Sequence, residues 1–388
     1  MPRSVSNDQR DAAPAFVPPQ PGAAPSEVAP SSSAAGPAGT GDNQLPFHGP
    51  WSALPPHYRI PDEAPSLADA QAYCERLAKS HYENFSVVTW FLPKHLHHHF
   101  YSVYAYCRMS DDLGDEVGNP QLSLALLDEW QAELNATYAS LAGEPVAHGD
   151  TQLGERKTEN GERISHRETG NGERETAPRH PVFIALRETV REYQVPPQPF
   201  DDLLKAFRQD QTVTRYETFD DLLGYCRYSA NPVGRLVLYV CGYRDEQRQQ
   251  LSDYTCTALQ LANFWQDVTL DYAKGRIYLP LEDLDRFGVS ESDIAQRRAT
   301  SQFRELMRFQ VERARDWFAR GLPLVGMVDR SLAIDIELFT RGGLAILDAI
   351  EHAGFDVLKA RPALSKTRKL CLVARAGLQA QLARFRGA

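Results

Sequence analysis

Apolar residues recur at helical spacing along most of the chain, without the apolar–polar alternation that marks half-buried strands. This pattern predicts helices over residues 66–84, 96–115, 122–141, 182–193, 200–208, 219–242, 246–273, 301–322 and 331–353. Pro232 lies inside one of these ranges, and we expect a kink there because proline removes a helical hydrogen bond. The chain is therefore predicted to be all-α.

Two segments lack the apolar residues that a packed helix needs. Residues 1–50 are rich in Pro, Ala, Ser and Gly, so a disordered arm is expected. Residues 149–177 are charged and Gly-rich and repeat Asn-Gly-Glu-Arg from Asn160 and Asn171, which predicts a solvated loop insertion. The rest of 51–388, roughly 300 residues, is enough for a single helical domain.

Two predicted helices carry polar side chains on a face whose flanking residues are aromatic and aliphatic. The first face has four residues at offsets 0, 4, 7 and 11: Tyr104, Arg108, Asp111 and Asp115. The second has four residues at offsets 0, 3, 7 and 11: Gln260, Asn263, Asp267 and Asp271. Because each spacing returns to the same side of a helix, each set forms a polar ladder within an otherwise apolar environment.

The ladders have the chemistry of a Mg²⁺ and diphosphate site. Mg²⁺ takes oxygen ligands, commonly one or two carboxylates completed by substrate phosphate oxygens. Arg108 and Arg276 could add charge-assisted hydrogen bonds to phosphate oxygens. A single acidic pair is ordinarily a solvated helix face. The second ladder, followed by Gly-Arg-Ile-Tyr-Leu-Pro at 275–280, makes the functional interpretation much stronger.

The segments Tyr104–Glu116 and Asn263–Pro280 resemble the two aspartate-rich motifs of the squalene/phytoene synthase family. The resemblance covers roughly residues 67–360 and implies an isoprenoid synthase fold around a central cavity, with Mg²⁺ as cofactor. It implies these metal ligands or their supports: Asp111, Asp115, Asn263, Asp267 and Asp271. It implies these diphosphate-binding residues: Arg108, Gln260, Asn263, Arg276 and Tyr278. It implies these catalytic residues in the cavity: Tyr104, Arg108, Tyr225 and Asn231.

Three departures from the family pattern bear on the reaction. Condensing members usually carry Arg immediately before the first Asp of the second motif, where this chain has Gln266. They usually read His-Ser-x-Ser-Phe where this chain reads His-Tyr-Glu-Asn-Phe at 81–85, and the stretch 229–234 is Ser-Ala-Asn-Pro-Val-Gly. Together these resemble the hopanoid-pathway squalene synthase C type, a hydroxysqualene synthase. Such a lyase ionises presqualene diphosphate and captures the cation with water, for which Tyr225, Tyr228 and Asn231 are candidate positioning residues.

Three functions remain open: this lyase, a transferase that joins two C15 or C20 diphosphates, and a non-catalytic assembly factor. The intact aspartates disfavour the assembly factor. Gln266 offers no charge to a second diphosphate, and Tyr82 and Asn84 replace serines at the cavity rim, which favours the lyase. No G-x-G-x-x-G or Walker A loop occurs, so no nucleotide-binding domain is expected.

Charge and composition narrow the expected partners and location. The net charge of −9 disfavours nucleic acid as a partner. The sequence has no run of 18 apolar residues, so no membrane-spanning helix is expected. Six cysteines without C-x-x-C fit reduced thiols in a cytoplasmic protein. Residues 357–388 hold eight Lys or Arg and no acids, so peripheral contact with the inner face of a membrane and a docked basic helix both remain open. Handover of product to other enzymes of the squalene pathway is also expected.

Overall fold

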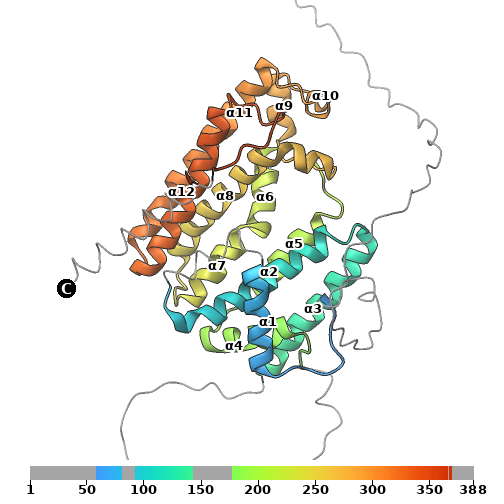
Figure 1. Cartoon of the computed structure of the whole chain (residues 1–388), viewed down its shortest axis with the longest axis vertical. Helices are drawn as coiled ribbons and strands as arrows, with labels where there is room; N and C mark the ends of the chain where they lie inside the picture. Colours follow the sequence, from blue (N-terminus) through green and yellow to red (C-terminus); the bar gives the residue numbers. More distant parts are fainter. Residues whose placement is uncertain (1–57, 81–91, 143–176, 366, 369–388) are drawn as a thin grey trace, which may run out of the picture. The chain divides into compact units, whose positions relative to one another are not determined.

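A computed structural model describes residues 58–80, 92–142, 177–365 and 367–368, and every regular element within them is helical (Figure 1). This confirms the predicted all-α class. The α-helices are α1 (Leu67–Ser80), α2 (His97–Asp115), α3 (Pro120–Ala142), α4 (Pro181–Tyr193), α5 (Gln198–Gln209), α6 (Phe219–Ser229), α7 (Asn231–Val240), α8 (Glu246–Ala273), α9 (Leu281–Phe287), α10 (Glu291–Ala295), α11 (Ser301–Gly321) and α12 (Arg330–His352). Two 3₁₀ turns, η4 (Lys94–Leu96) and η6 (Leu322–Gly326), precede α2 and α12.

The predicted helix over 219–242 is two helices rather than one kinked helix. The chain turns at Ala230, whose φ of −112° and ψ of −48° end α6 and begin α7. Pro232 therefore lies in the first turn of α7, where its missing N–H costs little. The short helices α9 and α10 were not predicted, because seven and five residues are too few to show a helical period. The predicted arm at 1–50, the loop insertion apart from Ala177, and Tyr82 and Asn84 lie outside the described residues.

Two large apolar clusters hold the helices together. One joins α1 to α5 with part of α7, and its largest fully buried side chains include Trp130, Tyr106 and Phe183. The other joins α6 with α8 to α12 and includes Trp265 and Phe303. In Figure 1, α1 to α5 lie towards the bottom and α9 to α11 towards the top, with α6 and α8 between them and α12 beside α8.

Helix α8 is the element that carries the second polar ladder through this core. Asp245 caps it by accepting a hydrogen bond from the backbone N–H of Arg248 at 3.0 Å. Its 28 residues span about 42 Å at the usual rise of 1.5 Å per residue. Packing against α7, α11 and α12 fixes α8 from several sides. Within the described ranges, no helix is both long and apolar enough to cross a membrane.

The histidines at the start of α2 are not all at the surface. His99 is buried, and its Nδ1 lies 2.9 Å from the hydroxyl of Thr189. Burial, together with neighbouring His98, lowers the pKa of His99 to about 4. This ring is therefore a neutral packing residue that joins α2 to α4.

Candidate active site

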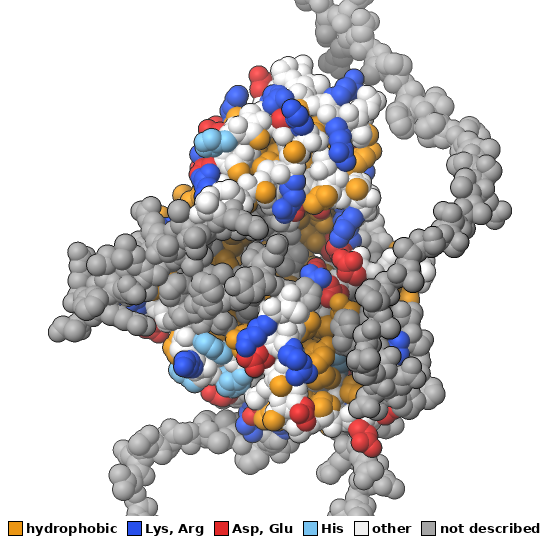
Figure 2. Space-filling view, in the orientation of Figure 1, with side chains coloured by type: hydrophobic (Ala, Val, Ile, Leu, Met, Phe, Trp, Pro, Cys, Tyr) orange, Lys and Arg blue, Asp and Glu red, His pale blue; other side chains and the backbone are white. Residues whose placement is uncertain are grey.

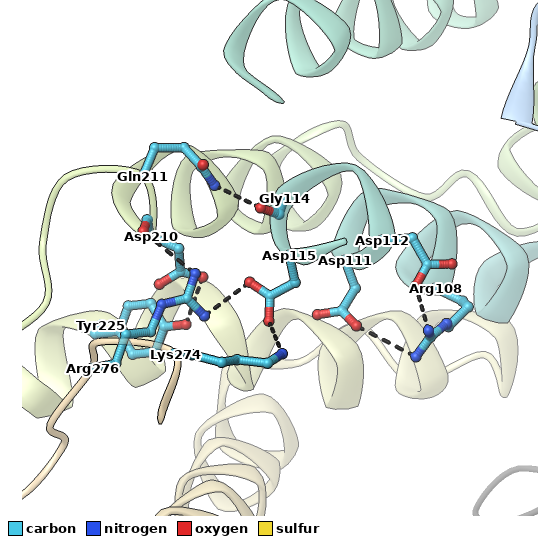
Figure 3. Close-up of polar contacts among 10 residues, drawn as sticks. All are labelled: Arg108, Asp111, Asp112, Gly114, Asp115, Asp210, Gln211, Tyr225, Lys274 and Arg276. Carbon is cyan, nitrogen blue, oxygen red and sulfur yellow. Dashed lines mark hydrogen bonds and ion pairs between the residues drawn. The ribbon is translucent and has the colours of Figure 1, made fainter. Parts of the chain in front are cut away.

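The C-terminal turn of α2 presents its three aspartates in two directions (Figure 3). Asp112 points into the protein, is 3 % exposed, and accepts hydrogen bonds from Arg108 and, at 2.5 Å, from the hydroxyl of Tyr58. Asp111 lies on the ladder face, with its Oδ2 3.6 Å from Nη1 of Arg108. Arg108 is therefore already shared between two carboxylates, and Asp111 keeps only the weaker contact.

Asp115 joins the two predicted motifs directly. Nη1 of Arg276 lies 2.8 Å from one of its oxygens, and Nζ of Lys274 lies 3.2 Å from the other (Figure 3). Both cations come from the loop immediately after α8, which carries the second ladder. Figure 2 shows acidic and basic side chains side by side near the middle of one face, with apolar side chains above and below.

Asp210 belongs to this cluster although the sequence analysis did not single it out. It caps the C-terminus of α5, is 7 % exposed, and accepts a hydrogen bond from the hydroxyl of Tyr225 at 2.9 Å. Burial raises the pKa of Asp210 to about 6, opposed by the guanidinium of Arg276. Its neighbour Gln211 donates to the carbonyl of Gly114 at 2.9 Å, which ties the ends of α5 and α2 together. The signal in the sequence was a polar Asp-Gln pair directly after an amphipathic helix.

On α8, Asp271 lies in a poorly compensated environment. Its Oδ2 is buried and has no hydrogen-bond partner among the described residues. Burial, and then the neighbouring carboxylate of Asp267, raise the pKa of Asp271 to about 7. Across the site, burial and then Asp115 raise the pKa of Asp111 to the same value. In each ladder, one carboxylate therefore lacks compensating positive charge, and a nearby cation would stabilise its ionised form.

Asp267 is bound by an arginine that the sequence analysis missed. Arg361 forms an ion pair with both oxygens of Asp267, one of them 3.1 Å from Nη2. The same Nη2 donates to Oε1 of Gln266 at 3.1 Å, and Nε2 of Gln266 donates to the carbonyl of Pro362 at 2.5 Å. Only the basic character of the C-terminal region hinted at such a contact, because 94 residues separate Arg361 from Asp267.

Gln266, the residue that replaces the arginine usual in condensing members, uses its amide within the protein. It is 6 % exposed, and both ends of its amide hold the segment that carries Arg361. That segment is anchored by Val357 and Leu358, which are fully buried, and by an ion pair between Asp356 and Arg304 at 2.8 Å. The chain downstream of α12 thus returns to α8 and contacts it at Gln266 and Asp267.

Aromatic rings form one wall beside the acidic residues. Tyr278 stacks on Phe264, with ring centroids 3.8 Å apart and planes 10° apart, and its centroid lies 5.8 Å from that of Tyr225. Tyr278 is 8 % exposed, and its ring belongs to this stack. Tyr104 is half-buried on α2, four residues before Arg108. Burial raises the pKa of Tyr104, so its hydroxyl stays protonated.

The remaining predicted site residues lie along α8 and at the α6–α7 junction. Asn263 is exposed and Gln260 is half-buried, both towards the N-terminal side of Asp267 on α8. Asn231 is buried and accepts a hydrogen bond from the hydroxyl of Thr257 at 2.9 Å. This hydrogen bond joins the start of α7 to α8.

The residues fit Mg²⁺ held jointly with a substrate, rather than a metal caged by protein alone. In the part of the chain that the structure describes, no three His, Cys, Asp or Glu side chains lie close enough to hold a metal ion. Mg²⁺ commonly needs only one or two carboxylates when phosphate oxygens complete its shell. Asp111 and Asp271, whose raised pKa values reflect missing positive charge, are suited to that arrangement.

Comparisons with known proteins agree with this geometry. Residues 78–368 match the squalene/phytoene synthase family. The crystal structure of squalene synthase HpnC from Alicyclobacillus acidocaldarius is 40% identical, with a TM-score of 0.63 over 79% of this chain and 99% of that one. A dehydrosqualene synthase structure is 24% identical, with a TM-score of 0.65 over 81% and 98% of the two chains, which supports the fold. The 15-cis-phytoene synthase of Synechococcus elongatus is 28% identical over 81% of this chain and 94% of its own length.

Proposed function

Since the chain belongs to the squalene/phytoene synthase family, whose members act on prenyl diphosphates, we propose that it converts presqualene diphosphate to hydroxysqualene. In this reaction the ester C–O bond breaks and diphosphate leaves with the electron pair. A water molecule then forms a new C–O bond with the rearranged cation. The water's proton passes to the released diphosphate, so no reductant is needed.

The observation that carries the proposal is the contact of Gln266 and Arg361. An arginine at position 266 would place a second guanidinium beside that of Arg361. Gln266 is uncharged, so Arg361 supplies the one guanidinium in these contacts. One guanidinium beside Asp267 suits a site for a single diphosphate better than a site for two. The 40% identity to squalene synthase HpnC over nearly all of that chain supports the same branch of the family.

The site residues have separate roles in this proposal. Asp111, Asp115, Asp267 and Asp271 would hold Mg²⁺, which when bound stabilises the charge on the leaving diphosphate. Arg276, Lys274 and Arg361 lie on these carboxylates and could turn to phosphate oxygens as the substrate binds. The ring stack of Tyr225, Phe264 and Tyr278 would face the carbocation, which aromatic faces stabilise and shield from bulk water.

A condensing transferase is the second candidate, because the phytoene synthases match most of the chain at 27–28% identity. The two functions differ in substrate. The transferase would consume two molecules of farnesyl or geranylgeranyl diphosphate, while the lyase would consume one presqualene diphosphate.

The proposed membrane contact of the basic tail rests mainly on residues 369–388, which lie outside the described residues.

Purified protein should be incubated with Mg²⁺ and presqualene diphosphate, and separately with farnesyl diphosphate, in the absence of nicotinamide cofactor. We expect presqualene diphosphate to give diphosphate and a C30 alcohol, and farnesyl diphosphate to remain. Efficient conversion of farnesyl diphosphate to presqualene diphosphate or squalene would replace the lyase with the transferase.

A further inference from the structure

The junction between α6 and α7 leaves polar groups without their usual helical partners. Pro232 has no N–H, so it cannot donate the helical hydrogen bond to the carbonyl of Tyr228, four residues earlier. Asn231, which precedes it, is 8 % exposed at the first position of α7. The junction thus combines a side-chain amide with a carbonyl that lacks its helical donor.

The hydrogen bond from Thr257 fixes which way the amide of Asn231 points. The Thr257 hydroxyl donates to Oδ1 at 2.9 Å, and Thr257 is itself only 2 % exposed. Nδ2 is therefore the end turned away from α8, and no hydrogen bond joins it to another of the described residues. A largely buried amide with an unused donor is a site for a bound water molecule.

The close approach of α7 and α8 holds this pair in place. Gly234 lies one turn after Asn231, and a Cβ there would overlap the side chains of Ser252 and Cys256 on α8. Arg235 and Asp253 form an ion pair at 2.6 Å across the same two helices. The position of Asn231 is therefore set by backbone packing as well as by Thr257.

Thr257 also relates the pair to the metal ladder. It lies one turn before Gln260 on α8 and ten residues before Asp267, about 15 Å along the helix axis. The pair is therefore separated along α8 from the carboxylates that would hold the metal and the diphosphate. Water bound there would lie away from the diphosphate end of the substrate.

The two other candidates for positioning water are already engaged. The hydroxyl of Tyr225 donates to Asp210 at 2.9 Å. The ring of Tyr228 is covered by the ammonium of Lys205, 3.7 Å from its centroid, and a cation at that distance would repel a carbocation. Of the three, Asn231 is the residue whose donor is neither bound to a carboxylate nor carried on a ring that an ammonium group covers.

We propose that Asn231 binds the water that captures the cation and that Thr257 is the positioning residue that orients its amide. This inference rests on the function proposed above. Nδ2 donates to the water oxygen, and one remaining lone pair forms the C–O bond to the cation. The carbonyl of Tyr228 accepts one of the water's hydrogens, and the proton released after capture passes to diphosphate. Without this anchor the cation would lose a proton instead and give a hydrocarbon.

The test measures the products of presqualene diphosphate in isotope-labelled water, together with the rate of diphosphate release. Asn231→Leu removes the amide at similar volume. Thr257→Val removes only the orienting hydroxyl, while Thr257→Ser retains it. Thr255→Val is a matched control, because Thr255 lies two residues earlier on α8 and its hydroxyl donates to the carbonyl of Leu251 in its own helix.

In Asn231→Leu we expect the share of labelled alcohol among C30 products to fall by about tenfold or more while diphosphate release continues. Thr257→Val should lower the same share, and Thr257→Ser and Thr255→Val should keep it near the wild-type value. An unchanged alcohol share in folded Asn231→Leu, or equal shares in Thr257→Val and Thr255→Val, would overturn the inference. If Asn231→Leu does not fold, the two Thr257 variants decide. Absence of alcohol from the wild-type protein would instead refute the proposed function.

Discussion

At the scale of single residues, Asp111 and Asp271 determine how the site responds to pH. Burial, with Asp115 beside one and Asp267 beside the other, raises the pKa of each to about 7. Without a metal these carboxylates therefore bind protons up to neutral pH. A metal ion must displace those protons, so proton and metal compete for the same oxygens.

We predict that Mg²⁺ binding in the presence of diphosphate weakens as the pH falls from 8 to 6. Above pH 7 both carboxylates are already ionised, so little change is expected between pH 8 and 9. Below pH 7 the apparent Kd should rise by about tenfold per pH unit for each proton displaced. Calorimetric Mg²⁺ titrations at several pH values would measure this, and a Kd independent of pH would contradict it.

The same carboxylates should be essential to turnover. Asp267→Asn and Asp111→Asn keep the side-chain volume but remove the charge that holds the metal, so each should lower kcat by orders of magnitude. Circular dichroism should show an intact fold. Full activity in excess chelator would exclude metal assistance altogether.

At the scale of the helices, α12 contains a carboxylate with no evident role in the site. Asp335 is 2 % exposed, and neither of its oxygens has a hydrogen-bond partner among the described residues. Burial raises its pKa to about 8. Because this value lies above that of an unfolded chain, Asp335 favours the folded state most at low pH, and this contribution is lost as the pH rises through 8.

Replacing Asp335 with Leu should therefore stabilise the protein, by about 1–3 kcal/mol, since a buried polar group without a partner is removed. The gain should be larger at pH 8.5 than at pH 6, because only the wild-type side chain must ionise in the apolar interior. Thermal unfolding of both proteins at the two pH values would test this. A stability gain that did not depend on pH would mean that Asp335 has a counter-ion.

Helix periodicity predicted the long elements well and the contacts between distant elements poorly. Both ends of α8 were predicted, because its apolar positions repeat and Asp245 and Gly275 bound it. Arg361 could not be predicted, since nothing local at 361 reveals that the chain folds back onto Asp267. The hydrogen-bond partners of Gln266 could not be predicted for the same reason. Contacts between side chains that lie 90 or more residues apart in the sequence depend on tertiary packing. Helical periodicity carries no information about that packing.

At the scale of the whole molecule, the described helices and the loops that join them contain every residue that we place in the site. Residues 1–50 and 149–176 contribute none of them and lack the apolar side chains that anchor a segment in a core. Deleting either segment should leave kcat and KM for presqualene diphosphate close to those of the full chain. A deletion variant with native thermal unfolding but no turnover would show that one of these segments reaches the site.

The pairing of Asp115 with Lys274 and Arg276 makes metal and diphosphate thermodynamically dependent on each other. Those two cations, with Arg361 on Asp267, already neutralise much of the negative charge that would attract Mg²⁺. A metal ion arriving alone would create excess positive charge, and an anion arriving alone would meet carboxylates. When the metal ion and the diphosphate are bound together, their charges cancel. The guanidinium and ammonium groups that they displace from the carboxylates then gain phosphate partners. By linkage each should tighten the other by the same factor, so that the protein binds the ion and the substrate as one salt.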